Sequence, residues 1–191
     1  MLDFDLVLQT DNILLRPLIS DDYSSFEKLT TDKSMWIYFT HDLSVKTELR
    51  EWVQTAVNEI KNKTRLAFTI LDKSHGVKIG STSIGNISLR DKRAEIGWTW
   101  ISKEYQGTGI NSLVKSLMIE YIFAVLDFER VEFKTDVLNT AARKALIRIG
   151  AKEEGILRRH TLMTNNRWRD TIYYSILNTE WENRRKGEGG I

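Results

Sequence analysis

A short glycine-containing segment is the strongest chemical signal in the sequence. It consists of Gln106, Gly107, Thr108, Gly109, Ile110 and Asn111, and it stands directly before a long periodic apolar run. Glycine tolerates positive φ and lets a backbone approach a ligand closely, while the first turn of a helix has N–H groups without intrahelical partners. The segment is therefore predicted to form a loop, here called the anion loop (residues 106–111), that binds an anion at a helix N-terminus.

Familiar nucleotide-binding motifs do not describe this loop. It lacks the third glycine of GxGxxG, and no GxxxxGK[ST] occurs in the chain. Asp136 could hold a ribose in the Rossmann manner, but residues 102–105 separate the loop from the preceding strand and no second mononucleotide half follows. A tight turn into a core helix is the simpler alternative.

The composition limits what the loop could serve. The chain has 191 residues, of which 41% are hydrophobic and 28% charged, as is ordinary for a globular domain. The net charge of +2 gives no overall field for wrapping nucleic acid, so no direct nucleic-acid partner is expected. No cysteine is present, which excludes disulfides, thiolate metal sites and cysteine nucleophiles.

Targeting signals are not visible in the sequence. The N-terminus MLDFDLVLQT lacks a basic region followed by a long apolar one, and no apolar run approaches the roughly 18 residues of a membrane span. We therefore expect no membrane association and a cytoplasmic location. We see no repeat, linker or second-domain boundary, so residues 1–191 are expected to form one domain.

Periodicity and turn residues predict an α/β arrangement. Helices are expected from Ser20, after a cap at Ser44, from Ile110, and over 139–150, where Asn139 has the residue type of an N-cap. Residues 182–191 are expected to form a frayed tail. The expected strands are 12–18, 65–72, 78–90, 93–102, 130–136, 152–163 and 168–177.

The segment AEIGWTWISKEYQGTGIN, residues 94–111, resembles the acetyl-CoA-binding region of the GNAT superfamily of N-acetyltransferases, whose signature is Q/R-x-x-G-x-G/A. The predicted order of strands and helices is similar to that family's order over almost the whole chain. VLNTAARKALIRIGAKEEGILRRH and RDTIYYSIL further resemble the Rim-type ribosomal-protein N-terminal acetyltransferase branch. The resemblance implies a single-domain GNAT fold, a mixed twisted sheet of about seven strands flanked by helices.

The resemblance also implies roles for the binding residues. N–H groups from Gln106 to Asn111 would hold the pyrophosphate of acetyl-CoA. Backbone groups of Trp100 and Ile101 would contact the pantetheine arm, and an N–H there would face the thioester oxygen. Asn139 matches an asparagine that contacts the cofactor in relatives, a role compatible with that of an N-cap.

Two positions depart from the family pattern. Asn111 stands where the motif has Gly or Ala, and asparagine tolerates unusual φ better than most residues. Leu146 stands where many relatives have a tyrosine that protonates the departing thiolate. The general acid is therefore unassigned.

Glu95 is the candidate general base, acting directly or through a water. It lies eleven positions before Gln106, the register in which the histone-acetylating branch of the family places its catalytic glutamate. Strand alternation puts Glu95 on the same side as Gly97 and Thr99, provided that no bulge intervenes. The alternative is a solvent-facing residue paired with Arg93 or with a neighbouring strand.

Other polar and aromatic residues have structural alternatives. The histidines are isolated and lack metal-ligand spacing, so no metal site is expected. Aromatic residues in strands could form the floor of an acceptor pocket but are more often core. A pair of arginines could recognise an acidic acceptor or the phosphate of the cofactor, although a solvated strand edge is the more common place for them. These residues are His41, His75 and His160; Trp36, Tyr38, Trp98 and Trp100; and Arg158 and Arg159.

The resemblance thus implies an N-acetyltransferase with acetyl-CoA as co-substrate and a primary amine as acceptor. A protein or peptide N-terminal α-amine is the favoured acceptor. The alternatives are a small-molecule amine acetyltransferase and a noncatalytic acyl-CoA-binding module of the same fold. A monomer or a homodimer is expected.

Overall fold

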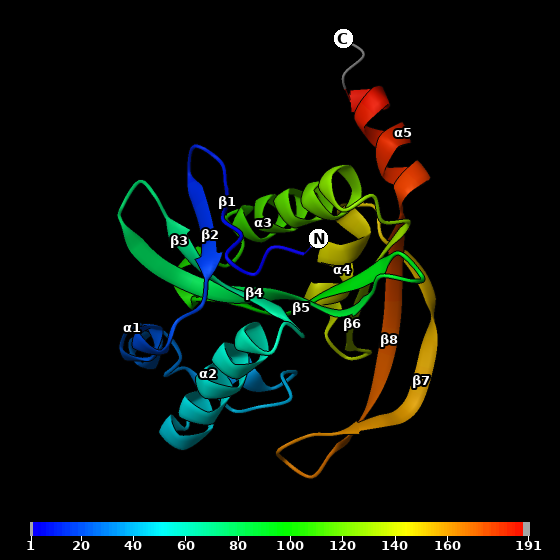
Figure 1. Ribbon diagram of the computed structural model, residues 1–191. Helices are drawn as coiled ribbons and strands as arrows, with labels where there is room; N and C mark the ends of the chain where they lie inside the picture. The colour runs from blue at the N-terminus through cyan, green and yellow to red at the C-terminus, as the bar shows by residue number, and fades with distance from the viewer. Residues whose placement is uncertain (1, 189–191) are drawn as a thin grey trace.

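A computed structural model describes residues 2–188, which form one mixed eight-stranded sheet flanked by helices (Figure 1). The strand order is β1-β2-β3-β4-β5-β6-β8-β7. The strands are β1 Leu8–Gln9, β2 Ile13–Pro17, β3 Leu66–Asp72, β4 Val77–Ser88, β5 Arg93–Ile101, β6 Arg130–Asp136, β7 Lys152–Leu162 and β8 Trp168–Leu177.

Helices lie on both faces of this sheet. α3 continues into a π-helical turn, η4 (Tyr121–Val125), and short 3₁₀ turns lead into α1, follow it, and precede the anion loop. The α-helices are α1 Tyr23–Leu29, α2 Lys46–Lys61, α3 Ile110–Glu120, α4 Thr140–Arg148 and α5 Asn178–Glu188, and the 3₁₀ turns are η1 Ser20–Asp22, η2 Lys33–Trp36 and η3 Lys103–Tyr105. Across residues 2–188, no helix is both long and apolar enough to cross a membrane.

The hydrophobic core is divided between the two faces. On one side, here called the α3 face, residues of α3 and α4 pack against strands from β2 to β8. On the other side, the α2 face, a second cluster joins α1, η2 and α2 to β3 and to Trp100 of β5. The α3-face core therefore spans the sheet from β2 to β8, whereas the α2-face core ends at β5.

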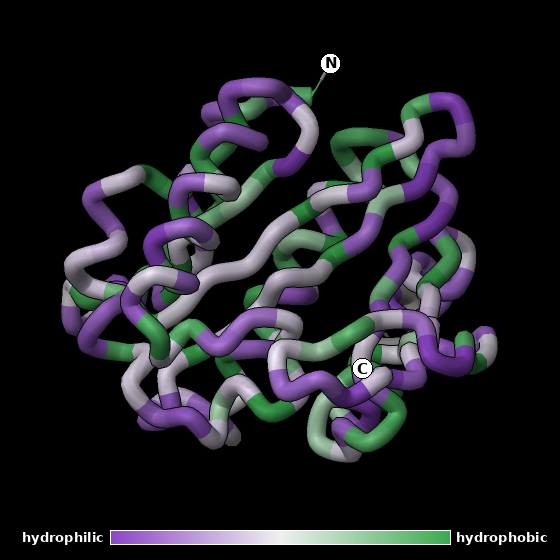
Figure 2. The backbone as a smooth tube through the Cα atoms, turned by 90° about the horizontal axis from the view of Figure 1, so that it is seen from below, coloured by the Kyte–Doolittle hydropathy of each residue, from purple (hydrophilic) through white to green (hydrophobic). Residues whose placement is uncertain are grey.

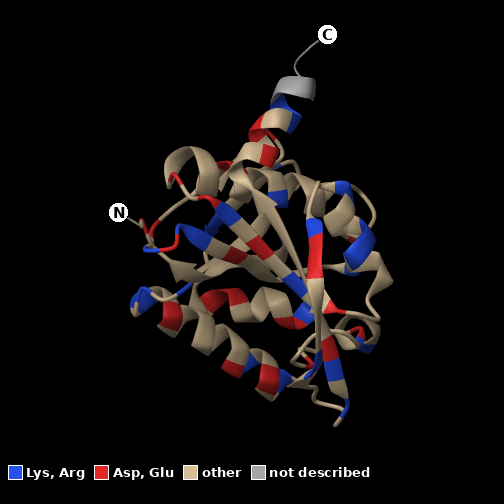
Figure 3. Cartoon of the chain, turned by 90° about the vertical axis from the view of Figure 1, so that its right-hand side faces the viewer, with Lys and Arg blue, Asp and Glu red and all other residues tan. Residues whose placement is uncertain are grey.

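Strand alternation explains this division. In β6, Val131 and Phe133 are buried in the α3-face core, so Glu132 and Lys134 point to the α2 face. Charged residues of both signs alternate along the strands at this side of the molecule instead of forming a one-signed patch (Figure 3). In Figure 2, hydrophilic segments are prominent in the outer turns and helices.

The buried carboxylate of Asp22 contacts side chains of three neighbouring strands, β2, β3 and β4. Asp22 accepts hydrogen bonds from Arg16 (2.6 Å) and Thr69 (2.6 Å), and Lys78 lies 2.8 Å from its Oδ1. Burial alone raises the pKa of Asp22, but these partners and the N–H of Ile19 outweigh it and lower the pKa to about 2.

The fold confirms the GNAT architecture expected from the sequence, with one more strand, β1, than the seven expected. The prediction of a frayed tail is wrong for residues 182–188, because α5 extends to Glu188. Trp181 Nε1 donates to Glu120 of α3 (3.1 Å), and Arg185 forms an ion pair with the same carboxylate (2.6 Å). Residues 189–191 lie outside the described part.

Candidate active site

The parallel strands β5 and β6 separate soon after they meet. Only Arg93–Glu95 of β5 pair with Arg130–Glu132 of β6. β5 then runs on to Ile101 and β6 to Asp136 without pairing with each other. Between the two strands lies an opening, here called the wedge, whose facing backbone groups have no ladder partner. An extended ligand with amide groups could pair with such an edge as an added strand.

The anion loop begins at the open end of β5. Gly107 and Gly109 have φ of 77° and 91°, a region that glycine enters without a Cβ penalty. Within residues 2–188, the N–H groups of residues 107–111 make no hydrogen bond, whereas that of Gln106 donates to the carbonyl of Lys103 (3.2 Å). The N–H groups free for an anion therefore begin at Gly107, one residue later than the sequence indicated.

Side chains of the loop hold its shape. Thr108 Oγ1 donates to the carbonyl of Tyr105 (2.7 Å), and Gln106 Nε2 donates to the carbonyl of Ile101 (2.9 Å). Asn111, in the first turn of α3, has a buried Oδ1 without a hydrogen-bond partner in the described chain. The loop is thus fixed by its own polar side chains, and its N–H groups remain available.

Trp100 and Ile101 have buried side chains at the end of β5. The Trp100 ring packs edge-to-face against Phe26 (4.9 Å between centroids) and Trp36 (5.8 Å). The core alternative therefore holds for Trp36 and Trp100. Any contact of Trp100 and Ile101 with a ligand in the wedge would use backbone atoms.

β5 contains a β-bulge at Trp98. Its pairing with β4 shifts register between Ser81 and Ser83, and Trp98 has a φ of 51°. The indole lies over Gly85, where an added Cβ would be only 2.7 Å from the ring. A glycine in the neighbouring strand thus makes room for the side chain that the bulge turns outward.

The bulge overturns the expected alternation along β5. Glu95 and Gly97 do share the α2 face, since a Cβ on Gly97 would lie 3.0 Å from Oε1 of Glu95. The hydroxyl of Thr99 instead lies 2.8 Å from that of Thr82, which contacts Met118 of α3. The condition that no bulge intervenes is therefore not met, and Thr99 lies on the opposite side from Glu95.

Glu95 lies at the vertex of the wedge, in the last residue pair that joins β5 to β6. Its side chain is only 5% exposed. Its Oε2 accepts a hydrogen bond from Asn86 Nδ2 (2.7 Å) and lies 3.0 Å from Nζ of Lys134 on β6. The expectation of a solvent-facing Glu95 is wrong, because its side chain is buried. Its ion-pair partner is Lys134 of the neighbouring strand and not Arg93.

Basic side chains that the sequence did not single out lie beside Glu95, on Trp98 and farther along the same face. Besides Lys134, Arg65 stacks on Trp98 with 4.8 Å from its guanidinium carbon to the ring centroid, and burial lowers the pKa of Arg65. Arg169 of β8 is 6% exposed. Alternation along RVEFKTD and WRDTIYYSIL could have placed Lys134 and Arg169 on one face, but not near Glu95.

A further buried cation lies on the α3 face. Lys115 of α3 is 7% exposed, and its Nζ lies 5.5 Å from the ring centroid of Phe133 in β6. Among residues 2–188 the ammonium has no carboxylate or carbonyl partner. Burial lowers the pKa of Lys115 to about 8.

α4 begins at the open end of β6. Asn139 is its N-cap, because Asn139 Oδ1 accepts a hydrogen bond from the N–H of Ala142 (3.0 Å). Leu146 is buried in the α3-face core. The N-cap prediction is confirmed, and Leu146 offers no proton donor to a ligand in the wedge.

The histidines are dispersed, as their sequence spacing indicated. His75 Nδ1 lies 2.6 Å from Asp72, and His160 Nδ1 lies 3.1 Å from the hydroxyl of Thr171. In the part of the chain that the structure describes, no group of three His, Cys, Asp or Glu side chains could hold a metal ion.

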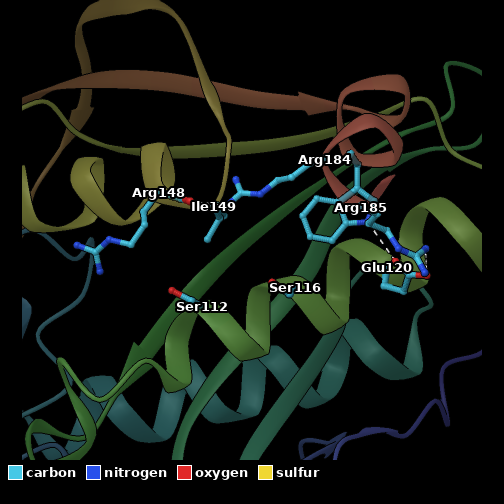
Figure 4. Close-up of a pocket in the computed structure, with 8 residues that line it drawn as sticks. Ser112, Ser116, Glu120, Arg148, Ile149, Arg184 and Arg185 are labelled. Atoms are coloured by element: carbon cyan, nitrogen blue, oxygen red, sulfur yellow. Dashed lines mark hydrogen bonds and ion pairs between the residues drawn. The ribbon is translucent and has the colours of Figure 1, made fainter. Parts of the chain in front are cut away.

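A cavity of about 460 Å³ lies between α3, the end of α4, and α5 (Figure 4). Ser112 and Ser116 of α3, Arg148 of α4 and the Arg185–Glu120 ion pair line it. Ser112 follows the anion loop directly, so this space continues from the loop along α3. Its size is within the range of small-ligand sites.

Known acetyltransferases resemble this chain in sequence and in fold. Residues 12–152 match the family model described as "Acetyltransferase (GNAT) domain". The Bacillus subtilis protein named "Putative ribosomal N-acetyltransferase YdaF" is 37% identical over 110 residues, which are 58% of this chain and 59% of that protein. The alignment thus spans less than two thirds of that relative's own length.

Two other matches cover nearly the whole chain. Spermidine N(1)-acetyltransferase of Escherichia coli is 26% identical over 179 residues, which are 93% of this chain and 92% of that protein. A crystal structure titled "putative acetyltransferase", from T. thermophilus, superposes with a TM-score of 0.86 at 25% identity and covers 99% of this chain and 100% of that one.

Proposed function

The chain belongs to the GNAT acetyltransferase family, and we propose that it transfers an acetyl group from acetyl-CoA to a primary amine. The observation that carries the proposal is the position of the anion loop at the open end of the free β5 edge. A single ligand that occupied both the anion loop and the free edge of β5 would need an anionic group and an extended chain with amide groups. Coenzyme A has this chemistry, in its pyrophosphate and its pantetheine arm.

The pyrophosphate would lie at the start of α3. The free N–H groups from Gly107 to Asn111 lie at the N-terminus of α3, where the helix dipole also favours negative charge. The positive φ values of Gly107 and Gly109 produce this backbone shape. Charge neutralisation at this loop therefore needs no lysine.

The pantetheine arm would enter the wedge beside Trp100 and Ile101. Its amide groups can pair with the backbone groups that β6 leaves free when it diverges from β5. A backbone N–H of this stretch would donate to the thioester oxygen, which gains negative charge as the amine attacks. Asn139 lies at the end of β6 and would contact the arm from the opposite edge.

Glu95 would accept the proton of the attacking ammonium, directly or through a water. Only a neutral amine has the lone pair needed for attack, so a base near the thioester is required. Glu95 has the right place, at the vertex of the wedge, and its partners Asn86 and Lys134 fix its orientation.

The departing thiolate has no assigned acid. Leu146 is apolar and buried, so it cannot take the role of the tyrosine found in many relatives. A thiol titrates near ~8.5, and a thiolate is therefore a stable leaving group around that pH. The transfer does not depend on a side-chain acid at this position.

The acceptor that we favour is a peptide N-terminal α-amine. An α-amine titrates near ~8 and a lysine amine near ~10.4, so at pH 7 roughly a tenth of the former is neutral, against well under a thousandth of the latter. The name of the B. subtilis relative points to ribosomal proteins, and that of the E. coli relative to a polyamine. A small amine is therefore the second candidate.

Turnover of an amine panel tests the proposal. Release of free CoA thiol would be measured with a peptide whose only amine is its N-terminus, a peptide whose only amine is a lysine, and spermidine, and mass spectrometry would locate the acetyl group. We expect acetylation of the α-amine. Exclusive lysine or spermidine modification would refute this acceptor, and tight CoA binding without any transfer would support the noncatalytic module instead.

A further inference from the structure

Arg169 of β8 is a buried cation on the α2 face. Ile172 and Tyr174 of the same strand belong to the α3-face core, so the residues that alternate with them point the other way. Thr171 lies between Arg169 and the wedge, and it pairs across the sheet with Asp136 at the end of β6. Arg169 therefore faces the same side as Glu95 and lies beyond the open end of the wedge.

The guanidinium of Arg169 is only partly satisfied. Its Nε donates to the hydroxyl of Thr171 (3.0 Å), and no carboxylate of residues 2–188 lies within ion-pair distance of it. Burial lowers the pKa of Arg169, and Asp136 and Glu95 raise it through longer-range attraction. A buried charge without an oppositely charged partner is costly, and the two terminal nitrogens of Arg169 remain free to bind an anion.

The neighbouring charges do not supply that partner, because each already has its own. Asp136 and Glu95 are the carboxylates that act on Arg169 at longer range, and they are paired with Arg167 and Lys134. These pairs are balanced in charge. Arg169 is therefore a buried cation without an ion-pair partner beside two balanced pairs.

The α2 face is also the side from which an amine would reach the wedge. The anion loop and α3 occupy the opposite side, and α2 covers only the strands up to β5. The turn between β7 and β8 approaches η2, where Met163, Asn165 and Lys33 line a small cavity of about 150 Å³. In Figure 1 the β7–β8 turn extends on the same side of the sheet as α2, and Arg169 is the second residue of β8, which leaves this turn.

We propose that Arg169 binds a carboxylate of the acceptor, so that the protein acetylates amines that also carry a carboxylate. This inference rests on the proposed amine acetylation. The planar guanidinium matches a carboxylate with two parallel hydrogen bonds, which fixes orientation as well as position. A polyamine would instead bring a second ammonium toward the unbalanced Arg169 and be repelled. The carboxylate belongs either to an acidic side chain of a peptide or to the α-carboxylate of an amino acid.

Matched acceptor pairs separate these two sources. One pair is a short peptide with Glu in second position and the same peptide with Gln; the other is leucine and leucine amide. Spermidine is the cationic comparison. For the wild type we expect kcat/KM to be about tenfold or more higher for the carboxylate member of one pair, with spermidine poorest. The preferred pair identifies the source of the carboxylate.

Variants then assign the preference to Arg169. Arg169→Gln should reduce the preference to within about twofold, mainly through KM, and Arg169→Lys should keep part of it because the positive charge remains. Arg90→Gln is the matched control, since its side chain is 96% exposed in the turn between β4 and β5. Thermal unfolding of each variant checks the fold, and Arg169→Lys carries the test if Arg169→Gln does not fold.

Each outcome is decisive. Equal use of both members of each pair by the wild type, a preference for spermidine, or an undiminished preference in either Arg169 variant would overturn the assignment while amine acetylation itself stood. Absence of turnover with every acceptor would overturn the proposed function and this inference with it. A carboxylate preference that falls in the Arg169 variants and not in Arg90→Gln supports the assignment.

Discussion

The carboxylate of Glu95 and the ammonium of Lys134 face each other across the vertex of the wedge, with 3.0 Å between Oε2 and Nζ. They come from the two strands whose pairing ends there. An amine that approaches Glu95 therefore meets a carboxylate already oriented by a cation and by Asn86. This arrangement makes the carboxylate the first group to test.

Replacing Glu95 by Gln should lower kcat by about a hundredfold or more, because the amide keeps the shape and removes the basicity. The affinity for acetyl-CoA should stay near that of the wild type. Steady-state kinetics over a range of pH, with calorimetry for acetyl-CoA, measures both. Glu104→Gln, at an exposed position of η3, is the control. An almost unchanged kcat with an intact acidic limb of the pH profile would remove Glu95 from the mechanism.

The anion loop should dominate cofactor affinity. Gly109→Val places a β-branched residue at a φ of 91°, which distorts the backbone that presents the free N–H groups. We expect acetyl-CoA binding to weaken by about tenfold or more. Lys103→Met should change it by less than about twofold, since Lys103 pairs with Asp32. Calorimetry on both variants decides, and equal losses would contradict the role of the loop.

Lys115→Met should stabilise the protein at neutral pH. Burial lowers the pKa of Lys115 to about 8 from 10.5 in the unfolded chain, so the ammonium opposes folding below pH 8 and this penalty fades as pH rises toward 10.5. The gain in unfolding free energy at pH 7 should reach about 3 kcal/mol at most. Urea unfolding at pH 7 and pH 9.5 measures it, with exposed Lys144→Met as control. A gain that does not shrink at higher pH would contradict this origin.

Asp22 should make stability sensitive to acid. Its pKa of about 2 in the folded protein lies below the 3.8 of the unfolded chain, so its contribution is present above pH 3.8 and is lost as pH falls toward 2. Asp22→Asn should lower the unfolding free energy by about 2 kcal/mol at pH 7 and flatten this acid dependence. Urea unfolding at pH 7, 4 and 2.5 measures both effects. The neighbouring exposed Asp21→Asn should leave the profile unchanged.

Local signals carried the prediction of the fold around the anion loop. The strand expected at 93–102 is Arg93–Ile101, the strand at 130–136 is exact, and Asn139 caps α4. Alternation, glycine pairs and cap residues act over a few neighbouring positions, so they can be read from the sequence. The order of these elements along the chain follows from the same local patterns and is similar to the order in the GNAT family.

Tertiary contacts explain what the sequence left out. The bulge at Trp98 depends on Gly85 in another strand, and the helical course of α5 depends on Glu120 of α3. The environment of Glu95 depends on Lys134, which lies 39 positions farther along the chain. Such pairings require the sheet register, which no local pattern specifies.

Only three residue pairs join β5 to β6. The sheet therefore behaves as two half-sheets, β1 to β5 and β6 to β7, that meet at a short seam formed by these pairs. The α3-face core crosses this seam and the α2-face core does not. Relative rotation of the halves would therefore pivot on the α3 side and change the width of the opening above Glu95. A ligand that pairs with the free edge of β5 would act as a splint between the halves, and amide hydrogen exchange along β5 and β6 would slow together when it binds.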